Sequence, residues 1–191
     1  AKIVANVDRA IEFIKTGNTA PVLIELDPSN TCNHGCYFCI SSYIHLPESK
    51  NLETYNKSVM PENILLGACK DFVDMGVRAV NWTGGGEPTI NPHLGKAIKY
   101  LGENNIKMGM FTNGTLLDKR DLFETVVDNM TWIRFSVDAG TKETYNSIRR
   151  AKDNQDWDKM ISNLTTLVET NNRKGKKIDI GVGFVITPDT Y

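Results

Sequence analysis

The sequence lacks several features that mark common functional classes. It has 22 Lys and Arg against 23 Asp and Glu, a net charge of −1, so it has no basic excess for nucleic acid or an anionic membrane. No apolar run approaches the roughly 18 residues that span a bilayer. Residues 1–17 contain Asp8, Arg9 and Glu12 and so lack the apolar core of a signal peptide. We therefore expect a cytoplasmic protein with no nucleic-acid or membrane partner.

Cysteine is also scarce, but its distribution is uneven. Three of the four cysteines, Cys32, Cys36 and Cys39, lie within eight positions with the spacing Cys-x3-Cys-x2-Cys. In a chain without a secretion signal, clustered thiols indicate metal binding or catalysis rather than disulfides, although one disulfide plus a free thiol remains open. A structural zinc site commonly uses two separated pairs of ligands, and no second pair exists here. His34 or His45 would complete a Cys3His set, so zinc also remains open.

The rest of the chain alternates between strand and helix patterns. Short apolar segments predict strands at residues 22–27, 77–83, 106–111, 131–138 and 177–186. Helical spacing predicts helices in residues 1–20 and at 61–75, 92–104, 118–128, 142–149 and 157–170. This alternation predicts an α/β fold with a parallel sheet or barrel. We expect residues 1–20 to form a helix packed on a core domain of residues 21–191, with Cys69 as a small core residue on the 61–75 helix.

Chemically unusual residues follow four of the predicted strands. They are Cys32, Cys36 and Cys39 after the first strand, residues 84–88 (Gly-Gly-Gly-Glu-Pro) after the second, Thr112 and Asn113 after the third, and Ser136 and Asp138 at the fourth. Ligands of parallel α/β folds gather at the carboxyl ends of the strands. Loops need turn residues for structural reasons as well. The concentration of thiols, glycines and acids at the carboxyl ends of the strands, called here the rim, nevertheless predicts an active site there.

The long polar loop of residues 41–60 interrupts the alternation. It contains Tyr43, His45 and Tyr55 and is longer than most βα connections. It is either a lid or specificity element above the rim or a solvated excursion, and the sequence favours neither.

Three thiolates on one tight loop suit a cluster that keeps one corner open. Four-iron clusters are normally held by four cysteines, so three leave one iron for an external ligand. The pattern resembles the radical S-adenosylmethionine (radical SAM) superfamily, whose hallmark is Cys-x3-Cys-x2-Cys with an aromatic residue before the last cysteine, here Phe38. The resemblance implies a [4Fe–4S] cluster on Cys32, Cys36 and Cys39, with S-adenosylmethionine chelated to the open iron. It also implies a partial (β/α) barrel.

A second motif strengthens the resemblance. Gly84, Gly85, Gly86, Glu87 and Pro88 resemble the family's Gly-Gly-Glu motif, which is implied to meet the methionine amino group of S-adenosylmethionine. Glycines allow the backbone to approach a ligand closely, and an acceptor complements an ammonium group. Taken alone, the same glycines would be read as a flexible turn.

Weaker parts of the resemblance concern the later strands. Thr112 and Asn113 are implied to lie around the cofactor, and Ser136 and Asp138 near its ribose. In the segment SVDAGTKETYNSIRR, Arg149 matches an arginine implied to pair with the carboxylate of S-adenosylmethionine. The alternative for Arg149 is a cation at a helix end, where the helix dipole favours positive charge.

The resemblance implies reductive cleavage of S-adenosylmethionine to a 5′-deoxyadenosyl radical, which takes a hydrogen atom from a peptide or small-molecule substrate. A donor such as flavodoxin or ferredoxin would supply the electron. The sequence singles out no catalytic acid or base; Tyr43, His45, Trp82 and Tyr145 are only candidates for a substrate-side donor, and Trp82 is better read as core. The family core usually has six βα units, so five strands suggest a fragment or a short member.

One alternative from another functional class remains. The chain could be a non-catalytic metal-binding α/β module, either a Cys3His zinc site or an electron-transfer iron–sulfur domain. That reading leaves the Gly-Gly-Gly-Glu-Pro segment and the Ser-Val-Asp segment at residues 136–138 unexplained.

Overall fold

The computed structural model describes residues 4–41, 58–151, 154–188 and 190. Within them, five strands form one parallel sheet whose spatial order is β1-β2-β3-β4-β5. The strands are β1 Leu23–Leu26, β2 Ala79–Trp82, β3 Lys107–Thr112, β4 Trp132–Ser136 and β5 Asp179–Gly183. Each strand therefore lies beside its predecessor along the chain, as in part of a (β/α) barrel. The predicted α/β fold with parallel strands is confirmed.

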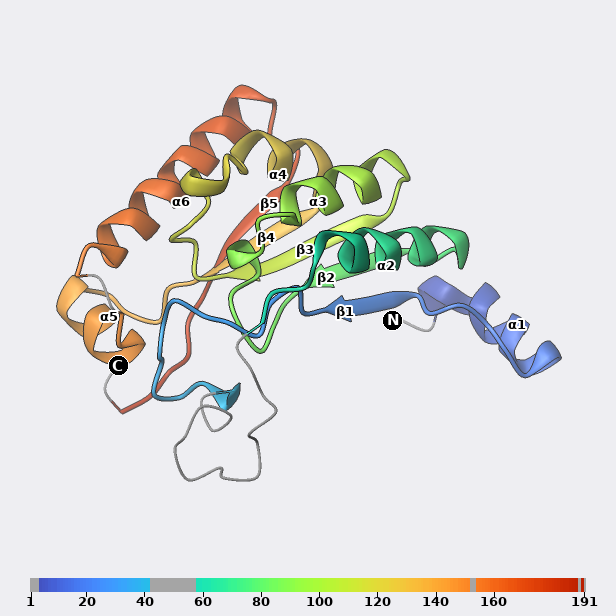
Figure 1. Ribbon diagram of the computed structural model, residues 1–191, viewed down its shortest axis with the longest axis horizontal. Helices are drawn as coiled ribbons and strands as arrows, with labels where there is room; N and C mark the ends of the chain where they lie inside the picture. Colours follow the sequence, from blue (N-terminus) through green and yellow to red (C-terminus); the bar gives the residue numbers. More distant parts are fainter. Residues whose placement is uncertain (1–3, 42–57, 152–153, 189, 191) are drawn as a thin grey trace.

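Four helices lie along one side of this sheet (Figure 1). They are α2 Glu62–Asp74, α3 Leu94–Glu103, α4 Phe123–Asn129 and α6 Asp156–Arg173. Alternate strand residues such as Trp82, Met108 and Phe135 are fully or almost fully buried in the core. Cys69 on α2 belongs to the same core and is fully buried, which confirms its prediction as a core residue. None of the helices in the described ranges is long and apolar enough to cross a membrane.

The opposite side of the sheet is called here the second face and is defined by Phe111, Arg134, Ser136 and Gly183. The register pairs Phe111 with Arg134 and Ser136 with Gly183, so these side chains and the glycine share one side of neighbouring strands. Ile133 and Phe135 alternate with them and enter the core. The second face therefore carries Arg134, Ser136, Gly183 and the aromatic ring of Phe111, whereas the first carries the apolar core.

The helix predicted over residues 118–128 is shorter than expected. A 3-10 turn, η4 Asp118–Arg120, comes first, and Asp121 then adopts a left-handed conformation with φ of 50° before α4 begins at Phe123. Aspartate tolerates this region better than most residues, because its short side chain can bond locally. The apolar spacing of the segment continues through the break, so periodicity alone did not reveal it.

The N-terminal helix α1, Val7–Thr16, has no buried residue. It lies beyond β1 (Figure 1) and contacts the core through charged side chains. Arg9 donates to the carbonyl oxygen of Gly76 (2.6 Å), and Arg78 forms an ion pair with Asp8. The division into a helix of residues 1–20 and a core of residues 21–191 stays a prediction.

Candidate active site

The loop after β1 that carries Cys32, Cys36 and Cys39, called here the cysteine loop, crosses the carboxyl ends of the strands. Hydrogen bonds fix it on two sides. On the β2 side, the N–H of Glu87 donates to the carbonyl oxygen of Thr31 (2.9 Å). On the far side lies the end of α5, Lys142–Arg149, where Gly35 N–H donates to the Arg149 carbonyl (3.0 Å) and Tyr37 N–H to that of Ile148 (3.2 Å). Because the last carbonyls of a helix lack partners within it, α5 supplies the acceptors that hold this loop.

The three clustered cysteines meet the glycine segment in one cavity. Its volume is about 150 Å³, and its lining includes Cys32, Cys36 and Cys39 together with Gly84, Gly85 and Gly86. None of the three thiols forms a disulfide within the described residues. A neighbouring cavity of about 190 Å³ shares these cysteines and is also lined by Phe38, Glu87, Thr112, Asn113, Ser136 and Arg149. The fold thus gathers residues that follow four different strands around the cysteine loop.

The electrostatics of this cavity suit a positively charged group. Burial, together with the negative charge of Glu87, raises the pKa of Cys32 to about 12. Burial also raises the pKa of Cys36, although the nearby Arg149 opposes this effect. Both thiols are therefore protonated at neutral pH until a cation compensates their charge, and a metal or metal cluster that binds them releases protons. The donor set of three thiols beside one cavity fits an iron–sulfur cluster with one corner open.

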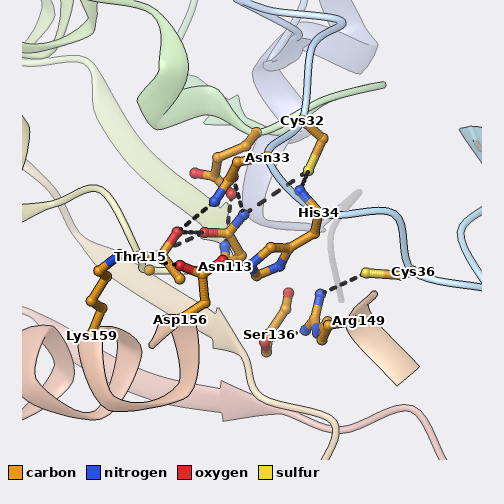
Figure 2. Close-up of polar contacts among 12 residues, drawn as sticks. Cys32, Asn33, His34, Cys36, Asn113, Thr115, Ser136, Arg149, Asp156 and Lys159 are labelled. Atoms are coloured by element: carbon orange, nitrogen blue, oxygen red, sulfur yellow. Dashed lines mark hydrogen bonds and ion pairs between the residues drawn. The ribbon is translucent and has the colours of Figure 1, made fainter. Parts of the chain in front are cut away.

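Arg149 connects the cysteine loop to β4 (Figure 2). Its side chain is buried, and Nη1 donates to the Cys36 sulfur at 3.3 Å. Nη2 donates to the Ser136 carbonyl and forms an ion pair with Asp138. Asp138 in turn accepts from Val185 N–H at 2.8 Å. Arg149 is thus a paired buried cation beside a cysteine ligand, and its predicted contact with a cofactor carboxylate stays a prediction.

Asparagine side chains tie the loop after β3 to the cysteine loop (Figure 2). The Asn113 amide donates to Asn33 Oδ1 (2.8 Å) and reaches the Cys32 sulfur at 4.0 Å. Asn33 donates to Thr115 Oγ1, whose hydroxyl donates to Asn113 Oδ1, both at 2.8 Å. Sequence reasoning named Asn113 but missed Asn33 and Thr115. Their only sequence signal is adjacency to the cysteine motif and to Thr-Asn-Gly.

His34, which the sequence offered as a fourth ligand of a zinc site, instead contacts Asp156. Its ring is fully buried, and Nε2 lies 3.2 Å from Oδ2 of Asp156 at the start of α6. Burial, helped by the charge of Arg149, lowers the pKa of His34, so the ring is neutral and donates from Nε2. Among the described residues, no three His, Cys, Asp or Glu groups gather around a position for one metal ion. His45 lies outside the described residues.

Asp156 was not predicted from the sequence. It holds the cysteine loop against α6 through His34, and its other oxygen lies 3.6 Å from Lys159 Nζ. His34 and Asp156 are 122 positions apart in the chain, so no local pattern connects them.

Glu87 is a nearly saturated hydrogen-bond acceptor. It is only 3% exposed, and its Oε1 accepts from Thr89 N–H (3.1 Å), the Thr89 hydroxyl (2.6 Å) and the Thr112 hydroxyl (2.6 Å). Its Oε2 accepts from Asn113 N–H at 2.7 Å. A carboxylate offers about four acceptor positions, so little capacity remains for a ligand. The side chain of Glu87 therefore joins the loop after β2 to the end of β3.

We expect Glu87→Gln to lower the free energy of unfolding by about 2–4 kcal/mol, because the new amide N–H2 faces donors and leaves buried groups unpaired. Urea denaturation of the anaerobic protein measures this change. The matched control is Glu62→Gln, where a half-exposed carboxylate pairs with Lys96 and His93, and a change below about 1 kcal/mol is expected. Equal midpoints for the two variants would contradict this structural role of Glu87.

The three glycines after β2 have different surroundings. A Cβ on Gly86 would lie 2.2 Å from the carbonyl oxygen of Thr31, and one on Gly84 would lie 2.9 Å from that of Gly86. Within the part of the chain that the structure describes, a Cβ on Gly85 would meet the Ser41 hydroxyl, at 3.8 Å. Gly86 is thus required by the contact between two loops, whereas Gly85 faces the cavity.

Two of the four candidates for a substrate-side donor, Trp82 and Tyr145, lie within the described residues, and both are buried. Trp82 is fully buried in the core, as predicted. Tyr145 is also fully buried and packs edge-on against His34 and Trp157, with ring centroids 5.8 and 5.3 Å away. Burial raises the pKa of Tyr145, so its hydroxyl is protonated. Tyr43, His45 and Tyr55 lie, with nearly all of the 41–60 loop, outside the described residues.

Comparison with known proteins extends these observations. The mycofactocin maturase MftC of Mycobacterium tuberculosis is 26% identical over 147 residues, which cover 75% of this chain and 34% of the maturase. MftC of Mycobacterium ulcerans is also 26% identical, over 76% of this chain and 37% of its own length. The chain thus spans about a third of the length of these curated relatives.

Solved structures share the fold. Streptococcus suis SuiB bound to S-adenosylmethionine superposes with a TM-score of 0.67 and 19% identity, over 94% of this chain and 38% of SuiB. BtrN in complex with AdoMet and 2-DOIA superposes with a TM-score of 0.52 and 15% identity, over 86% of this chain and 58% of BtrN. The family model of the radical SAM superfamily matches residues 26–188. Because this match covers most of the sequence, the chain belongs to the radical SAM superfamily, whose members use a [4Fe–4S] cluster and S-adenosylmethionine.

Proposed function

We propose that this protein is a radical SAM enzyme that cleaves S-adenosylmethionine reductively and takes a hydrogen atom from a peptide or small organic substrate. The observation that carries the proposal is the shared cavity of Cys32, Cys36, Cys39 and the glycine segment at the carboxyl ends of the strands. When bound, the cluster and S-adenosylmethionine supply the electron transfer and the radical chemistry. The chain itself binds, orients and shields them.

Each cysteine would hold one iron, and the surrounding groups would fix the position of the sulfurs. Arg149 donates to the Cys36 sulfur and so stabilises its negative charge. The Phe38 ring lies 5.9 Å from the Arg149 guanidinium and covers this side of the loop. Hydrogen bonds to sulfur and burial both tune the reduction potential of such clusters. Arg149 is therefore proposed to set the potential as well as to contact the cofactor.

The glycine segment would receive the methionine part of S-adenosylmethionine. Since the Glu87 side chain is occupied by Thr89, Thr112 and Asn113, we assign the ammonium contact to backbone carbonyls of Gly84–Pro88 rather than to the carboxylate. Glu87 then acts by holding this segment in position.

Residues of the later strands complete the proposed cofactor site. Thr112 and Asn113 border the cavity beside Glu87, and Ser136 lines its β4 side. Asp138 lies further along the same rim, next to Val185. Ser136 and Asp138 are proposed to meet the ribose. A reduced flavodoxin or ferredoxin inside the cell is the proposed electron donor.

Anaerobic reconstitution tests the proposal. The full-length protein is incubated with iron and sulfide, then with dithionite and S-adenosylmethionine, and 5′-deoxyadenosine is quantified by chromatography. We expect about four iron and four sulfide per chain, and 5′-deoxyadenosine that depends on the reductant. Stoichiometric zinc with no 5′-deoxyadenosine would instead identify a Cys3His zinc module. A loaded cluster that never cleaves S-adenosylmethionine would identify an electron-transfer domain.

A further inference from the structure

We propose that Arg134 binds a carboxylate group of the substrate on the second face of the sheet. The inference rests on the proposed function, which requires a substrate near the cofactor cavity. It goes further by naming the residue that recognises the substrate and the charged group that it recognises.

The Arg134 side chain is held in a defined position. Arg134 is in the middle of β4, paired with Phe111 of β3 and Gly181 of β5. Its guanidinium carbon lies 4.2 Å from the centroid of the Phe111 ring. A Cβ on Gly183 would lie only 3.2 Å from Arg134 Nε, so the absence of a side chain there leaves room for the arginine. Stacking and this neighbouring glycine therefore orient the guanidinium before any ligand binds.

The positive charge of Arg134 is uncompensated among the described residues. Arg134 is exposed and has neither a hydrogen bond nor an ion pair with any residue in the described ranges. Arg149, which lines the same cavity as Arg134, pairs with Asp138 and contacts the Cys36 sulfur. The two arginines and Asp138 line the same cavity of about 230 Å³, which thus keeps one net positive charge from these three groups. A planar guanidinium with free N–H donors matches a carboxylate in charge and geometry.

The position of Arg134 favours the substrate over the cofactor. Arg134 precedes Ser136 by two residues, so its backbone lies roughly 7 Å further from the rim that carries the cysteines. The 230 Å³ cavity shares Phe38, Ser136 and Arg149 with the 190 Å³ cavity beside the cysteines, so the two spaces adjoin. Phe38, Phe184 and Val185 give the same cavity apolar walls. These features select a carboxylate carried by an apolar group and place it next to the proposed radical source.

Equilibrium dialysis with labelled N-acetyl-L-leucine tests this site on the reconstituted, S-adenosylmethionine-loaded protein. We expect saturable binding of the acid and at least tenfold weaker binding of N-acetyl-L-leucinamide, because the amide lacks the charge. Arg134→Gln is expected to weaken binding of the acid at least tenfold and to remove the preference for acid over amide. Arg134→Lys keeps a positive charge and is expected to keep part of the preference. Arg173→Gln, which removes an exposed arginine paired with Glu124, is the matched control and leaves binding unchanged.

Several outcomes would overturn the assignment. They are absence of saturable binding to the wild type, equal binding of acid and amide, and unchanged affinity in Arg134→Gln. A tenfold loss of S-adenosylmethionine affinity in Arg134→Gln would assign the arginine to the cofactor and reject a substrate role. Formation of 5′-deoxyadenosine without substrate is measured in parallel. Wild type and Arg173→Gln should form it equally, and absence of 5′-deoxyadenosine in both would reject the proposed function rather than this site.

Discussion

The Cys36→Ala variant is expected to lose the broad visible absorbance at about 400 nm that an iron–sulfur cluster gives after anaerobic reconstitution. Cys36 is only 7% exposed, and its sulfur accepts a hydrogen bond from Arg149, so the thiolate is fixed at the centre of the cysteine loop. Alanine removes one of three proposed ligands and leaves the Arg149 donor unpaired. Iron content and the absorbance spectrum measure the result, and 5′-deoxyadenosine formation should fall to background.

Cys69→Ala provides a matched control within the same chain. Cys69 is fully buried on the core side of α2 and does not line either cavity at the cysteine loop. Its replacement removes one buried sulfur and should lower the free energy of unfolding by about 1 kcal/mol while the absorbance band persists. Loss of the band in both variants would show that Cys69 takes part in the site. Retention of the band in Cys36→Ala would refute the ligand assignment.

The Gly86→Ala variant is expected to lose both stability and cluster loading. Its Cβ would lie 2.2 Å from the Thr31 carbonyl oxygen and 2.6 Å from the Thr31 nitrogen and carbonyl carbon. All three are backbone atoms, so a rotamer change cannot relieve the overlap. The two loops must separate, which also breaks the bond from Glu87 N–H to the Thr31 carbonyl. We expect a loss of about 3 kcal/mol in the free energy of unfolding.

Gly85→Ala distinguishes this steric effect from a general need for glycine. Among the described residues, a Cβ at Gly85 would meet the Ser41 hydroxyl at 3.8 Å, an ordinary contact. Neither Gly85 nor Gly86 has a positive φ, so backbone strain does not separate the two positions. Thermal unfolding and iron loading of Gly85→Ala should therefore match the wild type. Similar losses in both variants would contradict the proposed contact between the glycine segment and the cysteine loop.

The fold was largely predictable because its signals are local. Each β strand is a short apolar segment, and each major helix carries its own apolar stripe, so the order of elements follows from windows of about ten residues. The parallel arrangement follows from their alternation. The break at Asp121 was not predictable in this way, because a single left-handed residue interrupts the helix without changing its apolar spacing.

The sequence by itself determined the three clustered thiols, the glycine segment and their common rim, since spacing and strand order are properties of the chain. Tertiary structure decided which side chains contact one another there. It joined Glu87 to Thr112 and Asn113, His34 to Asp156, and Arg149 to Cys36. Only the register of β3, β4 and β5 placed Arg134 over Phe111 and beside Gly183. These contacts join residues from separate elements. Which residues meet depends on how the strands and loops pack, and no local sequence pattern predicts that packing.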